Sequence, residues 1–329
     1  VEPILASAFR GTPDKHEQNV NPGCLSDIIG EIRPATLEDL DQAIDVADTF
    51  QPEWDRVTGA ERAEILDRAA TLMEENFAQL MALAIREAGK TAHDAIAEIR
   101  EAVDFLRYYA VQARLHFDKP KRLPGPTGEV NELSLHGKGV FACISPWNFP
   151  LAIFTGQVSA ALAAGNTVLA KPADQTPAIA MFAVRLMHEA GVPTDVLHLL
   201  IGRGSKMGAK VVSDERVTGV ALTGSTGTAQ HINRALAAKS GPINTLIAET
   251  GGQNVMIVDS SALPEQVTDD VITSAFSSAG QRCSALRVVY LQDSIADKVI
   301  EMLKGALAER QIGDPLDLAT DVGPVINAG

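Results

Sequence analysis

Apolar residues recur at helical spacing between residues 36 and 113, and this pattern predicts a run of helices. Thr36 stands at the N-cap position of the first helix, and Thr58 with Glu61 has the spacing of a capping box. Gly89 is placed to end one helix, and Thr91 is placed to begin the next. The first helix is expected to bury one face, formed by Leu37, Leu40, Ile44, Ala47 and Phe50.

The pattern changes between residues 120 and 139, where prolines and glycines surround a short alternating segment. Apolar and polar residues alternate over residues 129–135, which predicts a strand with two different faces. The flanking prolines and glycines favour turns on both sides of this strand. We therefore expect a β-hairpin or arm that interrupts the helical and sheet-forming parts of the chain.

Between residues 140 and 258, short apolar runs alternate with helical patterns. This alternation is typical of right-handed βαβ units, which build a parallel sheet covered by helices on both faces. The expected strands cover residues 140–145, 167–171, 196–202, 217–224 and 243–249, and the expected helices cover residues 151–164, 177–190, 205–212 and 226–239.

A second α/β unit follows, with strands expected at 254–259 and 285–292 and helices expected at about 264–279 and 294–310. Residues 313–329 are rich in turn formers and close no further element, so we expect this second unit to be unfinished. The first residues lack an initiator Met and do not resemble a signal peptide. They read like a cut made inside a longer polypeptide.

Charge and cysteine content narrow the possible function classes. The 28 basic and 42 acidic residues give a net charge of −14, which disfavours binding to nucleic acid or to anionic membrane surfaces. The three cysteines have neither the spacing of a disulfide scaffold nor that of a zinc site, and they indicate a reducing compartment. Hydrophobic residues make up 46% of the 329 residues, enough for a large core, and the length suggests two domains or one large α/β domain.

Cys283 is the first candidate for chemistry, because Gly, Ser and Ala surround it in the segment 277–286. It follows a predicted helix and precedes a predicted strand, so we expect it on a turn. A few per cent of an ordinary thiol is thiolate at neutral pH, and a thiolate can attack a carbonyl carbon. The alternative interpretation is a buried, inert cysteine.

Two further candidates follow predicted strands, where ligands bind in open α/β folds. Glu249 begins the segment ETGGQN and could act as a general base, or it could accept hydrogen bonds from backbone N–H groups nearby. Asn148, in the segment SPWNFP, could donate to a developing oxyanion, or it could simply form a turn before a helix.

A third pair of segments has features of a nucleotide site. Lys171 lies at the end of a predicted strand and Asp174 lies in the turn beyond it, so the two could contact ribose hydroxyls. The turn 222–227 combines Gly, Ser and Thr before a helix N-terminus, where N–H groups favour phosphate. No pair of histidines has metal-ligand spacing, so no metal is expected. We interpret as surface or capping residues His136, His188, His198 and His231.

Taken together, these motifs resemble the aldehyde dehydrogenase superfamily. The ordered segments that carry the resemblance are PWNF, KPADQTP, LTGST, ETGGQN and GQRCSA, and the resemblance extends from about residue 20 onward. Longer segments, such as GVFACISPWNFPLAIFTGQ and AETGGQNVMIVDSSALPEQV, are similar to the glutamate-semialdehyde dehydrogenase half of the bifunctional proline utilization A proteins.

The resemblance implies a role for each candidate residue. Cys283 is the nucleophile, and the Asn148 side chain with the Cys283 backbone N–H forms an oxyanion hole. Glu249 is the base for deacylation. Ser284 and Phe149 contact the substrate. The residues implied in NAD binding are Ile144, Ser145, Pro146, Trp147, Lys171, Asp174, Gly204, Gly208, Thr223, Gly224 and Ser225.

The resemblance also implies the fold class and the domains. The expected architecture is α/β, with a Rossmann-type parallel-sheet NAD-binding domain at 1–119 and 140–248. An oligomerisation arm is expected at 120–139, and an incomplete catalytic α/β domain is expected at 249–329. The family's downstream E-x-F-G-P segment is not found in this sequence, so we expect the chain alone to be inactive or nearly so.

The implied reaction is NAD-dependent oxidation of L-glutamate γ-semialdehyde, derived from 1-pyrroline-5-carboxylate, to L-glutamate in proline catabolism. The implied intermediates are a thiohemiacetal and a thioester on Cys283. The resemblance further implies a homo-oligomer linked to a flavin-dependent proline dehydrogenase domain. The expected location is the bacterial cytoplasm, with contact to the inner membrane made through the linked domain.

The sequence departs from the family pattern at two positions, and three alternative functions remain open. Asp174 stands where the family often has Glu, and Ala229 stands where its turn often ends in Gly. The alternatives are a dehydrogenase of another aldehyde, a cysteine hydrolase or acyltransferase, and an inactive fragment. Lys171 and the turn 222–227 argue against a hydrolase, which has no need of a dinucleotide groove.

Overall fold

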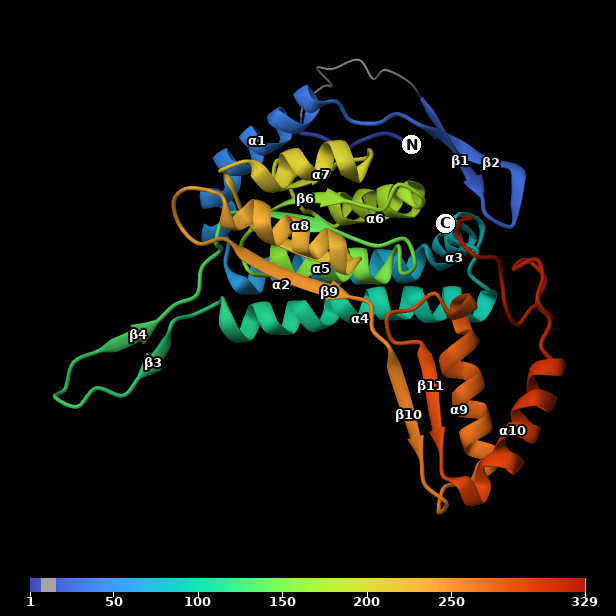
Figure 1. Cartoon of the computed structure of the whole chain (residues 1–329). Coiled ribbons are helices and arrows are strands. Elements are labelled where there is room, and N and C mark those ends of the chain that lie inside the picture. The colour runs from blue at the N-terminus through green and yellow to red at the C-terminus, as the bar shows by residue number, and fades with distance from the viewer. Residues whose placement is uncertain (7–15, 329) are drawn as a thin grey trace.

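A five-stranded parallel sheet forms the centre of the larger lobe (Figure 1). The computed structural model describes residues 1–6 and 16–328. The strand order is β7-β6-β5-β8-β9, so the chain moves outward from β5 and then returns to the other side of it. Ligands bind at such a switch point, beyond the carboxyl ends of the strands. The strands are β5 (Val140–Ile144), β6 (Thr167–Lys171), β7 (Leu197–Leu199), β8 (Val217–Gly224) and β9 (Thr245–Thr250).

Helices cover both faces of this sheet, as the alternating pattern predicts. Buried apolar side chains form a larger cluster on one face of the sheet and a smaller cluster on the other face. The larger cluster takes side chains from α2 (Gly59–Glu75), α3 (Phe77–Ala88), α4 (Ala92–His116), α5 (Ala152–Ala163) and α6 (Pro177–Glu189). The smaller takes side chains from α1 (Leu37–Arg56), α7 (Gly204–Ser213) and α8 (Thr226–Ala237).

The predicted helix starts at Thr36, Thr58 and Thr91 and the predicted helix end at Gly89 are confirmed. The Thr36 and Thr58 side chains each accept from the N3 backbone N–H, and both helices carry a complete capping box. Gly89 ends α3 in the left-handed conformation, with φ of 66°. The prediction that Leu37 is buried is wrong, because it occupies the first helical position, where the helix end leaves it 41% exposed.

Two buried glutamates cap helices that have no capping side chain of their own. Glu98 of α4 accepts from the backbone N–H groups of Leu151 and Ala152, at 2.9 and 3.1 Å. Glu87 of α3 caps the first turn of α6 in the same way. Burial raises the pKa of Glu87 to about 7, although the hydrogen bonds that it accepts lower it. Each carboxylate thus supplies an acceptor to the N–H groups that a helix leaves unsatisfied.

A smaller lobe packs a two-stranded parallel sheet against two helices (Figure 1). Its elements are β10 (Asn254–Val258), α9 (Pro264–Phe276), the short 3₁₀ helix η1 (Ser277–Gly280), β11 (Leu286–Leu291) and α10 (Asp293–Ala308). The predicted helix 264–279 is three residues too long, because Ser278 and Ala279 leave the helical region, both with φ of 54°.

Two antiparallel hairpins complete the structure. The predicted arm pairs β3 (Lys121–Leu123) with β4 (Asn131–Leu133) and projects away from the sheet (Figure 1). Near the N-terminus, β1 (Glu17–Asn21) pairs with β2 (Cys24–Ile32). Across the described residues, no helix combines the length and the apolar character needed to cross a membrane.

The interpretation of all four histidines as surface or capping residues is wrong for His198. This side chain lies on β7 and is completely buried, because β7 is covered on both faces. Its Nε2 faces the Asp195 carbonyl oxygen at 3.2 Å. Burial lowers the pKa of His198 to about 4, so the ring is neutral in the folded protein. His188 also has a pKa lowered by burial.

This burial predicts a loss of stability in mild acid. The pKa of His198 is about 4 in the folded protein and 6.5 in the unfolded chain. Its contribution to the free energy of unfolding is therefore fully present above pH 6.5 and is lost as the pH falls toward 4. When the pH is lowered from 7 to 5, the free energy of unfolding of the unsubstituted protein (the parent) is expected to fall by about 2 kcal/mol more than that of a His198→Gln variant. Urea unfolding at both pH values measures this difference. Glu87, whose raised pKa changes the stability with pH in the opposite direction, is present in both proteins, so its effect cancels in the comparison. A His116→Gln variant, changed at an exposed site, is the control and should show the same pH dependence of stability as the parent. An equal pH dependence in the parent and in His198→Gln would contradict the prediction.

Candidate active site

Cys283 lies on an exposed turn between η1 and β11. The turn is entered through three consecutive left-handed residues, Ser278, Ala279 and Gly280, with φ of 54°, 54° and 69°. Left-handed conformations are costly for non-glycine residues and persist where surrounding contacts impose them. The Arg282 guanidinium donates to two carbonyl oxygens in the last turn of α9, those of Thr273 and Ser274, and ties the turn to that helix. The thiol is therefore presented to solvent on a constrained backbone.

Asn148 reaches this turn from the larger lobe. Its Nδ2 donates to the Gln281 carbonyl oxygen at 2.8 Å, across 133 positions of sequence. Asn148 follows the carboxyl end of β5 by four residues, as the sequence pattern predicts. An amide Nδ2 has two hydrogens, so one remains for a second acceptor. The structure thus brings the predicted oxyanion donor and the predicted nucleophile to one place.

The segment that begins with Glu249 also reaches the turn. Glu249 is exposed at the end of β9, where it pairs in register with Thr223 of β8. Five positions later, Asn254 donates from Nδ2 to the carbonyl oxygens of Cys283 and Ala285, at 2.6 and 3.0 Å. Among the described residues, a Cβ added at Gly251 would meet nothing within 4 Å. Space beside the predicted base is therefore open.

Asn254 is a residue whose role the sequence analysis missed. It belongs to the segment ETGGQN, but no function was assigned to it. Its amide fixes the backbone on both sides of Ser284, which is exposed next to Cys283. A polar residue at the first position of an apolar strand was the available signal. Phe149, the other predicted substrate contact, has its ring 4.4 Å from the Lys90 Nζ.

A groove of about 630 Å³ runs along the carboxyl ends of β5 and β6 and between α7 and α8. Six of the predicted cofactor residues line it: Ile144, Lys171, Asp174, Gly204, Gly208 and Ser225. The remaining five do not line it, and they are Ser145, Pro146, Trp147, Thr223 and Gly224. Also lining the groove, and missed by the sequence analysis, are Ser205, Thr228 and His231.

Positive charge in this groove is held by a buried lysine. The Lys171 ammonium donates to the Pro172 carbonyl oxygen at 2.9 Å and to Asp174 Oδ1 at 2.8 Å. Lys171 is buried, whereas the Asp174 side chain is 42% exposed. The pair presents one fixed cation and one accessible carboxylate at the mouth of the groove.

The ends of β5 and β8 are joined by Gln157 of α5. Its Nε2 donates to the Ile144 carbonyl oxygen and to Thr223 Oγ1, at 3.3 and 3.0 Å. Thr223 is therefore placed behind the groove, where it orders the strand ends. Ala229, a departure from the family pattern, packs its methyl group against the apolar cluster beneath α8. It does not line the groove.

The residues present fit a dinucleotide. The N-terminus of α8, where Ser225 is the N-cap, opens onto the same groove. A buried lysine, an accessible carboxylate and a helix N-terminus at one groove are suited to ribose and phosphate groups. No cluster of metal-ligating side chains is found in the described part of the chain.

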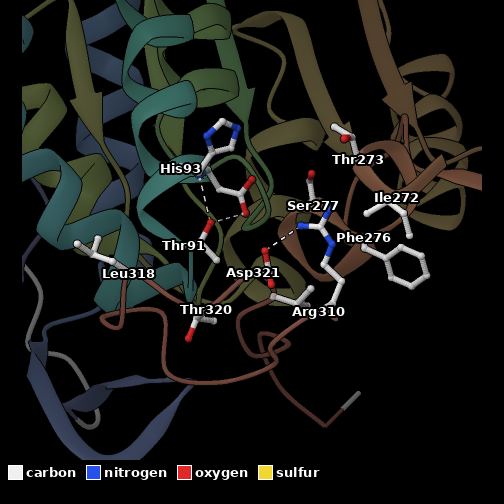
Figure 2. Close-up of a pocket in the computed structure, with 12 residues that line it drawn as sticks. Thr91, His93, Ile272, Thr273, Phe276, Ser277, Arg310, Leu318, Thr320 and Asp321 are labelled. Atoms are coloured by element: carbon white, nitrogen blue, oxygen red, sulfur yellow. Dashed lines mark hydrogen bonds and ion pairs between the residues drawn. The ribbon is translucent and has the colours of Figure 1, made fainter. Parts of the chain in front are cut away.

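A second pocket, of about 340 Å³, lies where α4 begins and contains none of the predicted site residues (Figure 2). Thr91, Ser277 and Phe276 line it, and an Arg310–Asp321 ion pair of 2.8 Å closes one side. Its wall includes Ser277, which adjoins the left-handed turn before Cys283.

Comparison with known proteins shows which family this chain resembles. The aldehyde dehydrogenase family model matches residues 9–329. The bifunctional protein PutA of Escherichia coli K12 is 54% identical over 313 residues, covering 94% of this chain and 23% of that protein. The 1-pyrroline-5-carboxylate dehydrogenase of Geobacillus sp. strain WCH70 is 35% identical over 328 residues, covering 99% of this chain and 64% of that protein.

Among solved structures, proline utilization A (PutA) from Bdellovibrio bacteriovorus inactivated by N-propargylglycine superposes with a TM-score of 0.96 and 35% identity. That match covers 99% of this chain and 34% of the solved chain. The chain therefore spans less than two thirds of the length of these relatives. The chain belongs to the aldehyde dehydrogenase family.

Proposed function

We propose that this protein oxidises L-glutamate γ-semialdehyde, which forms from 1-pyrroline-5-carboxylate, to L-glutamate with NAD as the acceptor. The observation that carries this proposal is the meeting of three segments around Cys283. Hydrogen bonds join the cysteine turn to the Asn148 segment and to the segment from Glu249 to Asn254. The cofactor groove begins at Ile144, four residues before Asn148. The names of the relatives support the choice of substrate.

The residues of the chain are suited to each step. The Cys283 thiolate adds to the aldehyde carbon, and the Asn148 amide with the Cys283 backbone N–H stabilises the alkoxide that forms. NAD, when bound, supplies the two-electron acceptor that turns this thiohemiacetal into a thioester. Glu249 then removes a proton from water, which attacks the thioester and releases glutamate and the thiolate. Ser284 and Phe149 are the proposed substrate contacts.

The proposal assigns parts of the fold to parts of the reaction. Residues 1–119 and 140–248 form the NAD-binding domain, and residues 249–329 carry the nucleophile. Residues 120–139 form an oligomerisation arm, which is supported by the exposure of Val130 and Leu133 on the projecting hairpin. We further propose a homo-oligomer in the bacterial cytoplasm that works together with a flavin-dependent proline dehydrogenase.

Formation of NADH from glutamate semialdehyde and NAD, followed by absorbance in the full-length protein, tests this function. NADH formation with other aldehydes and not with this one would assign a different substrate. Release of product without NADH would indicate a hydrolase or acyltransferase and would contradict the proposal.

The Asp174 carboxylate predicts a preference for NAD over NADP. A 2′-phosphate near this side chain would meet a like charge, and charges about 4 Å apart at a partly exposed site cost on the order of 1–4 kcal/mol. Asp174→Asn is expected to raise kcat/KM for NADP relative to NAD by about tenfold, because Lys171 would then be free to pair with the phosphate. Steady-state kinetics with both cofactors measure this ratio.

The matched control is Asp297→Asn, an exposed change on α10 in the smaller lobe, which should leave the ratio unchanged. Equal kcat/KM with NAD and NADP in the parent protein would contradict the prediction.

A further inference from the structure

Lys90 is a buried cation that the cofactor groove and the thiol chemistry do not use. It lies between Gly89, which ends α3, and Thr91, which caps α4. Only 4% of it is exposed, although lysine is rarely buried to this extent. Its ammonium has three partners: Ser278 Oγ at 2.8 Å, Glu98 Oε2 at 3.3 Å and the Phe149 ring at 4.4 Å.

One of these partners belongs to the turn that presents Cys283. Ser278 is the first of the three left-handed residues, and its backbone N–H donates to Asp94 Oδ2 at 3.0 Å. Lys90 and Asp94, on either side of the α4 N-cap, therefore hold the side chain and the backbone of the same residue. The pocket in Figure 2 borders this junction, with Thr91 and Ser277 on its wall. These two contacts help to impose the strained conformation.

The other two partners lead to the oxyanion donor. Phe149 directly follows Asn148 in the sequence. The segment that carries Asn148 leads into α5, and Glu98 caps the start of this helix. The ammonium thus bridges the segment that carries Asn148 and the turn that carries Cys283. Between them remains a cavity of only about 10 Å³, lined by Ala88, Gly89, Lys90, Trp147, Asn148, Ser278 and Gln281.

We propose that Lys90 is a positioning residue that fixes the spacing between the Asn148 amide and the Cys283 backbone N–H. This inference rests on the proposed function, in which those two groups share one oxyanion. Lys90 does not touch the reacting atoms; it acts through Ser278 and Phe149. A displacement of about 1 Å in such a site can lower a rate on the order of 10²-fold.

The kinetic test uses the double variant Lys90→Met/Glu98→Gln in the full-length protein. Removing both charges together avoids leaving one buried and unpaired, so the melting temperature is expected to stay close to that of the parent. The kcat for aldehyde oxidation is expected to fall at least about tenfold, while KM for NAD changes less than about twofold. Ser278→Ala, which removes only the hydrogen bond, is expected to lower kcat severalfold. Lys304→Met, at an exposed site on α10, is the control.

A second measurement does not depend on activity. Hydrogen–deuterium exchange of peptides covering residues 277–285 is expected to be about tenfold faster in the double variant, because the Lys90–Ser278 bond that holds the turn is lost. Peptides of α8 should exchange at the parent rate. Parent-like exchange over 277–285, or a parent-like kcat in an active enzyme, would overturn the inference. A parent protein that oxidises no aldehyde would instead contradict the proposed function, and the exchange measurement would still decide the role of Lys90.

Discussion

Replacement of Cys283 by alanine is expected to reduce aldehyde oxidation below about 10⁻⁴ of the parent rate. The thiolate forms the bond that converts the aldehyde into an intermediate able to lose a hydride, and the turn carries no second thiol. NAD affinity should remain within about twofold of the parent value, because the groove is built from other elements. Steady-state NADH formation and calorimetric NAD binding measure the two quantities.

The other two cysteines provide the controls. Cys24→Ala removes an exposed thiol on β2, outside the site, and should leave turnover unchanged. Cys143 is completely buried in the larger lobe, and burial raises the pKa of its thiol to about 12, so it supplies no thiolate at neutral pH. Appreciable turnover in Cys283→Ala would mean that Cys283 is not the nucleophile.

Asn148→Ala is expected to lower kcat by roughly 10²–10³, the usual cost of losing one oxyanion donor. The amide is needed where negative charge develops, so the loss should fall on kcat more than on KM for the aldehyde. The same change removes the hydrogen bond to the Gln281 carbonyl oxygen, and a melting temperature measured in parallel reports that structural part.

Asn131→Ala, on the exposed arm, is a matched control that should keep the parent kcat. A decrease of only a fewfold in Asn148→Ala would assign Asn148 to the turn before α5 and leave the oxyanion without this donor.

The large sheet could be predicted because its strands are short apolar runs closed by turn formers. The helix expected at 151–164 is observed as Ala152–Ala163, and the strand expected at 167–171 is observed without change. The end of α9 could not be predicted from Ser278 and Ala279, since neither residue type signals a left-handed backbone. Contacts made by the folded protein impose that conformation, and local sequence does not contain them.

The same distinction applies to the site. Asn148, Glu249 and Lys171 could be predicted because each lies at or just beyond the carboxyl end of an apolar strand, where a parallel sheet collects ligand-binding groups. Lys90 could not be found in this way. It lies between two helices and acts on Ser278, which is 188 positions away in sequence. A long-range hydrogen bond of this kind leaves no periodic pattern.

The long sequence separation of these contacts also orders the events of folding. The groove takes its lining from residues 144–232, so each contact across it closes a loop shorter than about 90 residues. The bonds that join Asn148 and Lys90 to the cysteine turn close loops of 133 and 188 residues. Contacts of large sequence separation form slowly, because more chain entropy must be lost before they are made. During refolding, affinity for NAD should therefore return before turnover does, and the interval between them is the time that the two lobes need to dock.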